Sequence, residues 1–379
     1  MNILIVTEYF PQSADCEVRG GVEARAFYFA RELAKEHSVS VICSRLEKQK
    51  SEDNFLGISV YRCGLERSYA HGGSLLGRVS FLLSAIRCGR SLETDIADGY
   101  NFIAYIAVFF ITLRKKGVRK IATYHDVWVG EWIRNMGFLS GILGEMLERF
   151  SLRVSWDGII AVSKYTKNKL IARGISPQII TVIPNGVDIQ EYESVQVKKF
   201  ERPTVVYVGR LVEYKRVDDL LGAIKIIKGH IPDIQCKVIG SGPQENKLKA
   251  LAEEFGIADC VEFFGFVPAR KDVIALMKRS HVFCLPSLVE GFGMVTIEAL
   301  ASGIPYVNSD IPATREITQG GQGGLLYEPK NIYNLSAKIV HILQSNDVYC
   351  NKKGEAKKII QQYDWKTGIS ILEKVYSNN

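Results

Sequence analysis

The chain has 379 residues, of which 47% are hydrophobic and 23% are charged. This length suits two domains with a buried core each, and the composition excludes a long disordered region. The net charge is +7, and residues 1–187 hold 24 Lys and Arg against 18 Asp and Glu, so the surplus lies in the first half. Such a surplus is typical either of an anionic partner, such as a charged acceptor or an acidic membrane surface, or of an ordinary solvated face.

The cysteines and the longest apolar run help to predict the cellular compartment of the protein. The eight cysteines are scattered, without a C-x-x-C pair and without a secretory signal after Met1, so neither disulfides nor a zinc site is expected. The apolar run at 102–113 is much shorter than the roughly 20 residues that cross a bilayer, so we expect a buried helix there. We therefore expect a cytoplasmic protein, with a peripheral position at the inner face of the membrane as one alternative.

The first half alternates short apolar runs with longer amphipathic segments. Residues 2–6 are apolar and lead through a glycine-containing loop into a helical pattern at 22–36. Further expected elements follow in the order strand 39–43, helix 75–92, helix 102–113, strand 120–124 and strand 158–162. Strands that alternate with helices predict a parallel, doubly wound sheet.

The same pattern starts again at residues 204–208. The expected order is strand 204–208, helix 217–228, strand 235–239, helix 245–254, strand 261–263, helix 272–279, strand 282–285, helix 294–302 and strand 306–308. Residues 184–203 contain Asn-Gly, charges and two prolines without sustained periodicity, so we expect the linker there. The predicted domains are 1–187 and 188–361, with a C-terminal helix at about 362–379 that packs back on the first domain.

The stretch from Pro286 to Pro305 is the most informative part of the sequence. It places Glu290 and Glu298 eight residues apart around Gly291-Phe292-Gly293. A Gly-x-Gly turn that opens a helix allows backbone N–H groups to approach a diphosphate, and the helix N-terminus favours negative charge. Glu290 can accept hydrogen bonds from sugar hydroxyls, and Glu298 can hold a ribose diol. A tight turn with two surface carboxylates is the alternative interpretation of the glycines alone.

This stretch closely resembles the E-x7-E motif of family-four retaining glycosyltransferases. Further landmarks of that family occur in the expected order, namely Gly20-Gly21-Val22-Glu23, Tyr124-His125-Asp126, Val162-Ser163-Lys164, Ile183 to Asp188, Val208 to Leu211 with Lys215, Gly240 to Pro243, and Phe264 to Val267. The resemblance implies an α/β fold of two Rossmann-like doubly wound domains that face each other across a cleft, the GT-B architecture. It also implies a nucleotide-sugar-binding second domain and an acceptor-side first domain.

The resemblance assigns roles to individual residues. It implies that Arg210 and Lys215 contact the donor diphosphate and stabilise the charge that develops as the sugar leaves, together with Glu290 in the catalytic set. Both cations follow the first strand of the second domain, where doubly wound folds bind ligands. His125 is similar to the active-site histidine of the family, which lies beside the transferred sugar. The implied donor-binding residues are Gly20, Gly21, Gly209, Gly240, Val267, Gly291, Phe292, Gly293, Met294 and Glu298.

The sequence holds no Asp-x-Asp triplet and no cluster with metal-ligand spacing. We therefore expect no metal and no other cofactor, since the NDP-sugar is a substrate. One departure from the family lies at Pro312-Ala-Thr-Arg-Glu316, where many relatives have Gly-Gly.

The predicted activity is that of a retaining, NDP-sugar-dependent glycosyltransferase of hexosyltransferase type. Its acceptor is a hydroxyl group of a glycan, a polysaccharide precursor or a lipid-linked molecule, and no nucleic acid partner is expected. The alternatives are a nucleotide-sugar epimerase of the same architecture and a catalytically silent sugar-nucleotide-binding protein.

A helical pattern in the basic first half raises the question of a membrane partner. Its apolar positions are Phe138, Ile142, Leu143, Met146, Leu147 and Phe150, with charged residues between them. Such a helix either faces its own core or docks on an anionic membrane that carries the acceptor.

Overall fold

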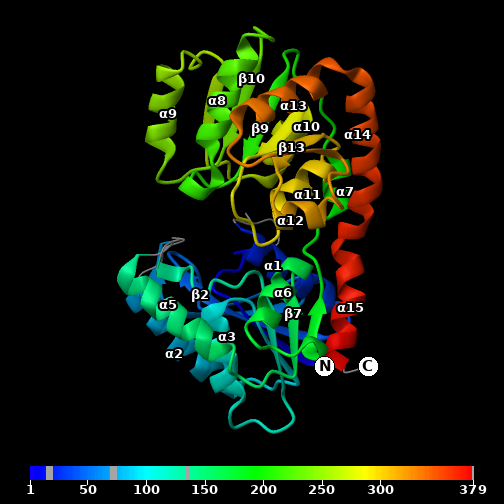
Figure 1. Cartoon of the computed structure of the whole chain (residues 1–379). Helices are drawn as coiled ribbons and strands as arrows, with labels where there is room; N and C mark the ends of the chain where they lie inside the picture. The colour runs from blue at the N-terminus through cyan, green and yellow to red at the C-terminus, as the bar shows by residue number, and fades with distance from the viewer. Residues whose placement is uncertain (14–19, 69–74, 134–136, 378–379) are drawn as a thin grey trace. The chain divides into compact units, whose positions relative to one another are not determined.

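The computed structural model describes residues 1–13, 20–68, 75–133 and 137–377. The chain forms two compact units (Figure 1). Unit 1 comprises Met1–Asn185 and Trp365–Asn379, and unit 2 comprises Gly186–Asp364. Both are α/β units built on a parallel sheet, so the α/β class predicted from the sequence is confirmed.

The sheet of unit 1 has the strand order β3-β4-β2-β1-β5-β6-β7-β8. All neighbouring strands are parallel except β3 and β4, which form an antiparallel pair. Its strands are β1 (Asn2–Val6), β2 (Ser38–Leu46), β3 (Glu52–Phe55), β4 (Ile58–Arg67), β5 (Ile96–Gly99), β6 (Arg119–Tyr124), β7 (Gly158–Ala161) and β8 (Ile180–Val182). Strands β2 to β4 lie on one side of β1 and strands β5 to β8 on the other. A topological switch point therefore lies between β1 and β5.

Helices cover both faces of this sheet, as is usual when a parallel sheet is buried. They are α1 (Gly21–Leu33), α2 (Leu75–Ser91), α3 (Phe102–Thr112), α5 (Phe138–Ser151), α6 (Lys164–Ala172) and α15 (Trp365–Ser377). The apolar run predicted as a buried helix forms α3, whose N-cap Asn101 accepts a hydrogen bond from the backbone N–H of Ala104. No described helix is long and apolar enough to cross a membrane.

The last helix, α15, completes the core of unit 1. The ring of Trp365 stacks on Tyr28 of α1, with ring centroids 5.4 Å apart. Near the other end of the helix, the Tyr376 hydroxyl donates to the buried carboxylate of Asp98 over 2.8 Å. Burial raises the pKa of Asp98 to about 7, although hydrogen bonds from Tyr376 and Thr123 and the charge of Arg25 oppose this rise.

Unit 2 holds a sheet of six parallel strands in the order β11-β10-β9-β12-β13-β14. They are β9 (Thr204–Val208), β10 (Gln235–Ile239), β11 (Val261–Gly265), β12 (Val282–Leu285), β13 (Tyr306–Ser309) and β14 (Gly324–Tyr327). The helices are α7 (Ile189–Ser194), α8 (Val217–Lys228), α9 (Glu245–Glu254), α10 (Arg270–Arg279), α11 (Met294–Ala301), α12 (Pro312–Ile317), α13 (Ile332–Gln344) and α14 (Asn346–Ile359). The switch point of this sheet lies between β9 and β12.

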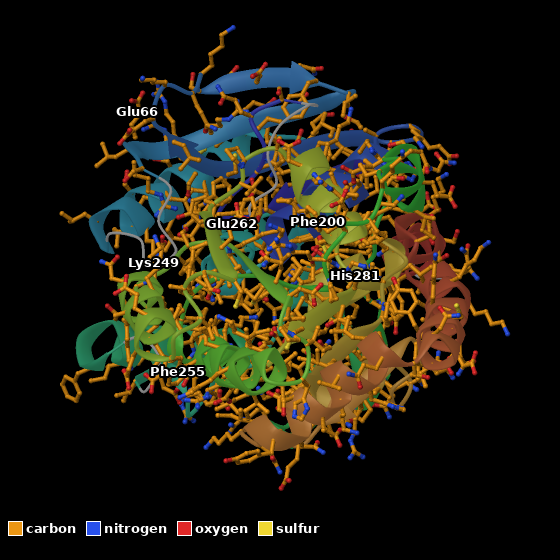
Figure 2. All side chains as sticks on the ribbon, turned by 90° about the horizontal axis from the view of Figure 1, so that it is seen from above. Glu66, Phe200, Lys249, Phe255, Glu262 and His281 are labelled. Atoms are coloured by element: carbon orange, nitrogen blue, oxygen red, sulfur yellow. The ribbon has the colours of Figure 1, made fainter. Side chains whose placement is uncertain are left out.

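In the second sheet, different residues lie at the starts of the strands and at their carboxyl ends. Phe200, Glu262 and His281, labelled in Figure 2, mark the edge at which its strands begin. There the backbone N–H of Thr204 donates to Nδ1 of His281 over 3.1 Å, which ties the starts of β9 and β12 together. The residues predicted to bind a donor follow the opposite, carboxyl ends of the strands.

The predicted linker at 184–203 contains a helix that the sequence pattern did not indicate. The helix is α7, and the Asp188 side chain caps it by accepting from the N–H of Glu191. The chain passes from unit 1 to unit 2 at Asn185 and Gly186, and returns at Asp364 and Trp365.

Candidate active site

The switch point of the second sheet brings together the charged residues predicted from the sequence. Arg210 and Lys215 follow β9, and Glu290 follows the neighbouring strand β12. Lys215 Nζ lies 2.5 Å from Glu290 Oε1, and the two side chains are only 12% and 11% exposed. Two loops that are far apart in the sequence are therefore joined by an ion pair at the position where doubly wound folds bind ligands.

Arg210 is held beside this pair by a tyrosine that also contacts both loops. Its Nη2 donates to the Tyr214 hydroxyl over 2.5 Å. The backbone carbonyl of Tyr214 accepts from the N–H of Leu288 over 2.8 Å, which fixes the β12 loop against the β9 loop. The result is a partly buried cluster of two cations and one carboxylate, and a diphosphate is one group whose charge would complement the cations.

The glycine turn before α11 has the conformation that its sequence suggests. Gly293 has φ +90° and is the N-cap of α11, so a side chain there would be strained. Phe292 is buried and packs edge-to-face on Tyr363. Gly291 and Met294 flank the turn. The Thr296 N–H donates to the Gly293 carbonyl, and the N-terminal end of α11 carries the partial positive charge that favours an anion.

Two other glycines predicted as donor contacts have a packing reason of their own. Gly209 and Gly240 have φ +156° and +128°, and a Cβ at 240 would collide with the carbonyl oxygen of Gly209. The Gly209 N–H donates to Ile239 and the Leu211 N–H donates to Ser241, so the loops after β9 and β10 run in backbone contact. Close loop packing thus accounts for glycine at 240 without any ligand. Val267 lies half-buried just beyond β11.

Glu298 lies on α11 and is held by a residue that the sequence did not indicate. Arg270 Nη1 contacts Glu298 Oε1 over 3.1 Å. Arg270 also contacts Glu191 on α7, over 2.9 Å. Neither Arg270 nor Glu191 belongs to a recognisable motif, because the contact joins segments 79 residues apart and shows no local sequence pattern.

In unit 1, His125 lies just beyond β6, at the carboxyl edge of the first sheet. Its ring centroid is 6.2 Å from that of Tyr100, and its Nε2 is buried without a hydrogen-bond partner among the described residues. Burial, and after it the positive charge of Arg25, lowers the pKa of His125 from 6.5 to about 3. The imidazole is therefore neutral near pH 7.

The glycines at the start of α1 follow the first switch point. Gly20 is the N-cap of α1, with φ −163° and ψ 161°, an extended conformation that any residue adopts. A Cβ at 20 would meet no other described atom within 4 Å, so neither strain nor packing in the described part of the chain requires glycine there. Gly21 is the first residue of the helix.

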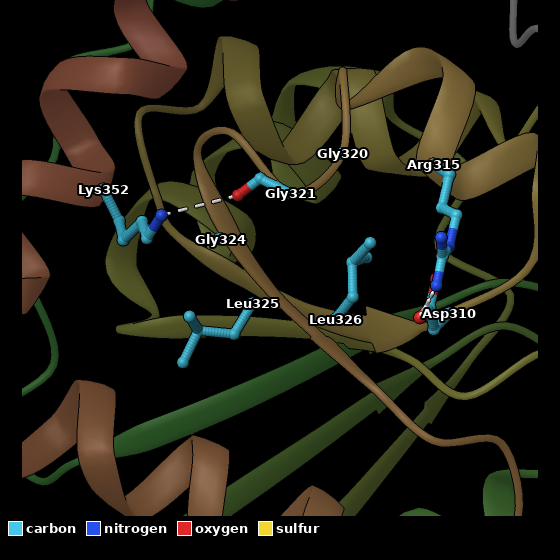
Figure 3. Close-up of a pocket in the computed structure, with 8 residues that line it drawn as sticks. All are labelled: Asp310, Arg315, Gly320, Gly321, Gly324, Leu325, Leu326 and Lys352. Carbon is cyan, nitrogen blue, oxygen red and sulfur yellow. Dashed lines mark hydrogen bonds and ion pairs between the residues drawn. The ribbon is translucent and has the colours of Figure 1, made fainter.

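A pocket at one side of unit 2 does not contain these residues. It has a volume of about 340 Å³ and lies along β14, the edge strand, which two strands separate from β9 (Figure 3). Its charged groups already have partners, since Arg315 pairs with Asp310 and Lys352 contacts the carbonyl of Gly321 and the carboxylate of Glu355. Arg315 belongs to the segment that departs from the family pattern. Among the described residues there is also no group of three or more His, Cys, Asp or Glu side chains that could hold a metal ion.

Comparison with known proteins decides the family. Residues 19–191 match the family described as "Glycosyltransferase Family 4", and residues 188–361 match "Glycosyl transferases group 1". An uncharacterised glycosyltransferase of Methanocaldococcus jannaschii is 30% identical over 307 residues, which cover 79% of this chain and 80% of that protein. The chain belongs to glycosyltransferase family 4.

Other similar proteins place this family 4 glycosyltransferase among enzymes with diverse names. Glycogen synthase of Mycobacterium tuberculosis is 27% identical over 312 residues, covering 80% of this chain and 73% of that protein. A human protein named as one component of phosphatidylinositol N-acetylglucosaminyltransferase is 25% identical over 362 residues, covering 88% and 72%. The alternative of an epimerase gains no support from the family matches or from these relatives.

Solved structures show the same fold. A sucrose-phosphate synthase of Thermosynechococcus elongatus superimposes with a TM-score of 0.83 at 18% identity and covers 100% of this chain and 98% of that chain. HepE of Anabaena, in complex with UDP-glucose, superimposes with a TM-score of 0.78 at 18% identity over the whole of both chains. The fold of this family 4 glycosyltransferase is thus the GT-B fold predicted from the sequence.

Proposed function

We propose that the enzyme transfers a sugar from a nucleoside diphosphate sugar to a hydroxyl acceptor, with retention at the anomeric carbon. The observation that carries this proposal is the cluster of Arg210, Lys215 and Glu290 at the switch point of the second sheet. Cations beside a helix N-terminus suit a diphosphate, and an adjacent carboxylate suits sugar hydroxyls. HepE, which shares the fold, is described in complexes with UDP and with UDP-glucose, and this supports a nucleotide-sugar donor.

Each residue has a role in this proposal. Arg210, Lys215 and the N–H groups at Gly291 to Met294 bind the diphosphate, while Glu290 binds the transferred sugar. Glu298 holds the ribose, and Phe292 fixes the turn by packing on Tyr363. Gly209, Gly240 and Val267 line the loops that bound the nucleotide. Gly20 and Gly21 give backbone access to the diphosphate, which provides a reason for glycine at position 20, where packing gives none.

The proposed chemistry is a front-face displacement. The bond between the anomeric carbon and the diphosphate oxygen breaks, and the acceptor oxygen bonds to the same face of that carbon. The acceptor proton passes to the leaving phosphate oxygen. His125, whose pKa lies at about 3, is too weak a base for this proton and instead donates a hydrogen bond to the transferred sugar.

We further propose that the diphosphate is bound without a divalent metal. Arg210 and Lys215 neutralise the charge that a metal ion would otherwise neutralise, and the end of α11 adds a partial positive charge. The free thiols of the seven described cysteines suit a reducing compartment, and we place the reaction in the cytoplasm.

A donor panel tests the reaction. Thermal shift with UDP-, GDP-, ADP-, TDP- and CMP-sugars identifies the donor, since a ligand at ~100 times its Kd stabilises by about 2.7 kcal/mol. NMR of the product then gives the anomeric configuration. Inversion at the anomeric carbon, or stabilisation by none of the five donor classes, would refute the proposal.

For the acceptor side, we propose that unit 1 docks on an anionic membrane through α2 and α5. On α5 the small residues point inward, because a Cβ at Gly144 would collide with the Trp132 ring and a Cβ at Gly141 with the backbone of Ile133. The large apolar residues Phe138, Ile142, Met146 and Phe150 are exposed instead. This is the reverse of a helix that buries its apolar face in its own core.

The neighbouring helices extend this surface. α3 packs against both α2 and α5 (Figure 1), and the exposed residues of α2 include Leu76, Val79 and Leu83 at helical spacing. Neither α2 nor α3 contains an acidic residue, and exposed Arg87 and Arg90 end the α2 stripe. Apolar residues beside a basic end suit an anionic lipid surface. The human relative, whose name refers to phosphatidylinositol, supports a lipid-linked acceptor.

Vesicle co-sedimentation tests the membrane proposal. The wild type should bind phosphatidylglycerol vesicles at low salt and bind neutral phosphatidylcholine vesicles weakly. A double variant, Leu83→Glu with Met146→Glu, should lose this binding, because both side chains are 64% exposed. Tyr333→Glu in unit 2, where the side chain is 78% exposed, is the matched control and should bind as the wild type does. Equal binding by the double variant and the control would contradict the proposal.

A further inference from the structure

Arg270 lies between α11, the helix that carries Glu298, and α7, the first helix of unit 2. It is the first residue of α10, and its three guanidinium nitrogens all have partners. Nη1 contacts Glu298 Oε1 on α11, Nε contacts Glu191 Oε2 on α7, and Nη2 donates to the Tyr192 hydroxyl over 3.0 Å. One planar group thus joins three helices.

The α7 side of this network is firmly fixed. Tyr192 is 1% exposed, and its backbone carbonyl accepts a hydrogen bond from Lys278 on α10 over 2.8 Å. Lys278 also donates to the carbonyl of Val195, so α10 holds both the last turn of α7 and the residue after it. The contacts with α7 therefore hold the guanidinium group in a fixed position relative to Glu298. A planar group with fixed donors determines the direction of the carboxylate that it binds.

The contact leaves half of the Glu298 carboxylate available. Arg270 binds Oε1, and no other described side chain bonds to Oε2. The side chain is 13% exposed, so it is accessible to a ligand without being free to adopt many rotamers. A carboxylate that is oriented through one oxygen offers the other as an acceptor of fixed direction for a hydroxyl group.

We propose that Arg270 is a positioning residue for the nucleoside part of the donor. It orients Glu298 so that Oε2 accepts a hydrogen bond from a ribose hydroxyl, and Glu191 and Tyr192 hold Arg270 in place. This inference rests on the ribose role that we propose for Glu298. The consequence to test is discrimination between nucleotides with and without ribose hydroxyls. If the Glu298 carboxylate points in another direction, it no longer binds the ribose hydroxyls, while the contacts to the diphosphate stay intact.

The experiment compares nucleoside diphosphates with and without the ribose diol. Calorimetry measures Kd for UDP, GDP and ADP and for the 2′,3′-dideoxy counterpart of the one that binds most tightly. The wild type should prefer the ribonucleotide about ten-fold. Arg270→Met should weaken ribonucleotide binding to near the dideoxy level, with the dideoxy affinity almost unchanged. Arg270→Lys, which keeps the charge but not the planar fork, should lie between them.

Controls separate positioning from folding. Lys271→Met changes the next, exposed residue of the same helix and should leave both affinities unchanged. Should Arg270→Met fail to fold, Glu191→Gln tests the same role with a smaller expected effect, since it weakens the support on the α7 side and leaves the Tyr192 contact in place. An equal loss for the ribonucleotide and the dideoxynucleotide would overturn the positioning role and indicate a phosphate contact or a loosened fold.

The outcome for Glu298→Gln distinguishes this inference from the function on which it rests. If Glu298→Gln abolishes the preference and Arg270→Met does not, Arg270 has no positioning role while the ribose role of Glu298 stands. If Glu298→Gln leaves the preference intact, the ribose role itself fails. Absence of binding by UDP, GDP and ADP would refute both proposals for these ligands.

Discussion

The ion pair between Lys215 and Glu290 makes the effect of Glu290→Gln unusual for a binding-site substitution. Without a donor, each side chain neutralises the other across 2.5 Å. The proposed donor separates these partners, because its diphosphate contacts Lys215 while its sugar hydroxyls contact Glu290. Glutamine keeps the shape of the side chain and removes its charge. Lys215 then loses its anionic partner and becomes more attractive to a diphosphate.

The two effects of Glu290→Gln have opposite signs. Loss of a charge-assisted hydrogen bond to the sugar, stronger in the transition state than in the ground state, costs about 1.5 to 3 kcal/mol, so kcat should fall by a factor on the order of 10 to 10². The pair is mostly but not fully buried, and we take its value as about 1 kcal/mol. Binding of the bare NDP should therefore be unchanged or up to about five-fold tighter.

Calorimetry with NDP and steady-state kinetics with the NDP-sugar measure these effects separately. Lys215→Met should weaken NDP binding, in the direction opposite to Glu290→Gln. Glu262→Gln is the matched control, because Glu262 forms a 2.5 Å pair with Lys237 at the other edge of the sheet and should affect neither quantity (Figure 2). Unchanged turnover in Glu290→Gln, or a loss of NDP affinity in it, would show that the proposed roles of this pair are wrong.

Two further outcomes follow from the site. Excess EDTA should leave transfer unchanged, because Arg210 and Lys215 neutralise the diphosphate, and a loss that Mn²⁺ or Mg²⁺ restores would refute this. His125 has a folded pKa of about 3 against 6.5 when unfolded, so the unfolded chain binds more protons between these values and stability falls as the pH drops through this window. His125→Gln should remove that loss, about 2 kcal/mol between pH 6.5 and pH 5, in urea unfolding. Asp98 has the opposite trend, because its raised pKa makes stability fall as the pH rises toward 7, so the variant is compared with the wild type at each pH. An identical acid dependence in both proteins would contradict the reasoning.

The sequence was sufficient for elements whose pattern is local. The strands at 2–6 and 204–208 and the helix at 102–113 are marked by continuous apolar runs between polar residues, and the structure has them within one residue. The strands β3 and β4 were missed, because charged and polar residues in Glu52–Phe55 and Ile58–Arg67 hide their alternation. β5, with the sequence IADG, is too short to have a period.

The site was predictable to the extent that its residues follow strands of one sheet. The rule for carboxyl ends placed Arg210 and Lys215 where doubly wound folds bind ligands, and the family resemblance put Glu290 in the same catalytic set. The structure brings Lys215 and Glu290 into contact. The partner of Glu298 was not predictable, because Arg270 reaches it through the packing of α10 on α7. Gly240 shows the converse, since its place in a motif suggested a ligand contact while close packing of two loops already requires glycine.

The discontinuity of unit 1 has a consequence for synthesis on the ribosome. Its core includes the contacts of Trp365 with Tyr28 and of Tyr376 with Asp98. Trp365 and Tyr376 are translated only after the whole of unit 2. Unit 2 is continuous, so its core needs no segment from outside residues 186–364. Unit 1 keeps part of its core uncovered until α15 has been made, so only unit 2 can fold from one uninterrupted stretch of the chain.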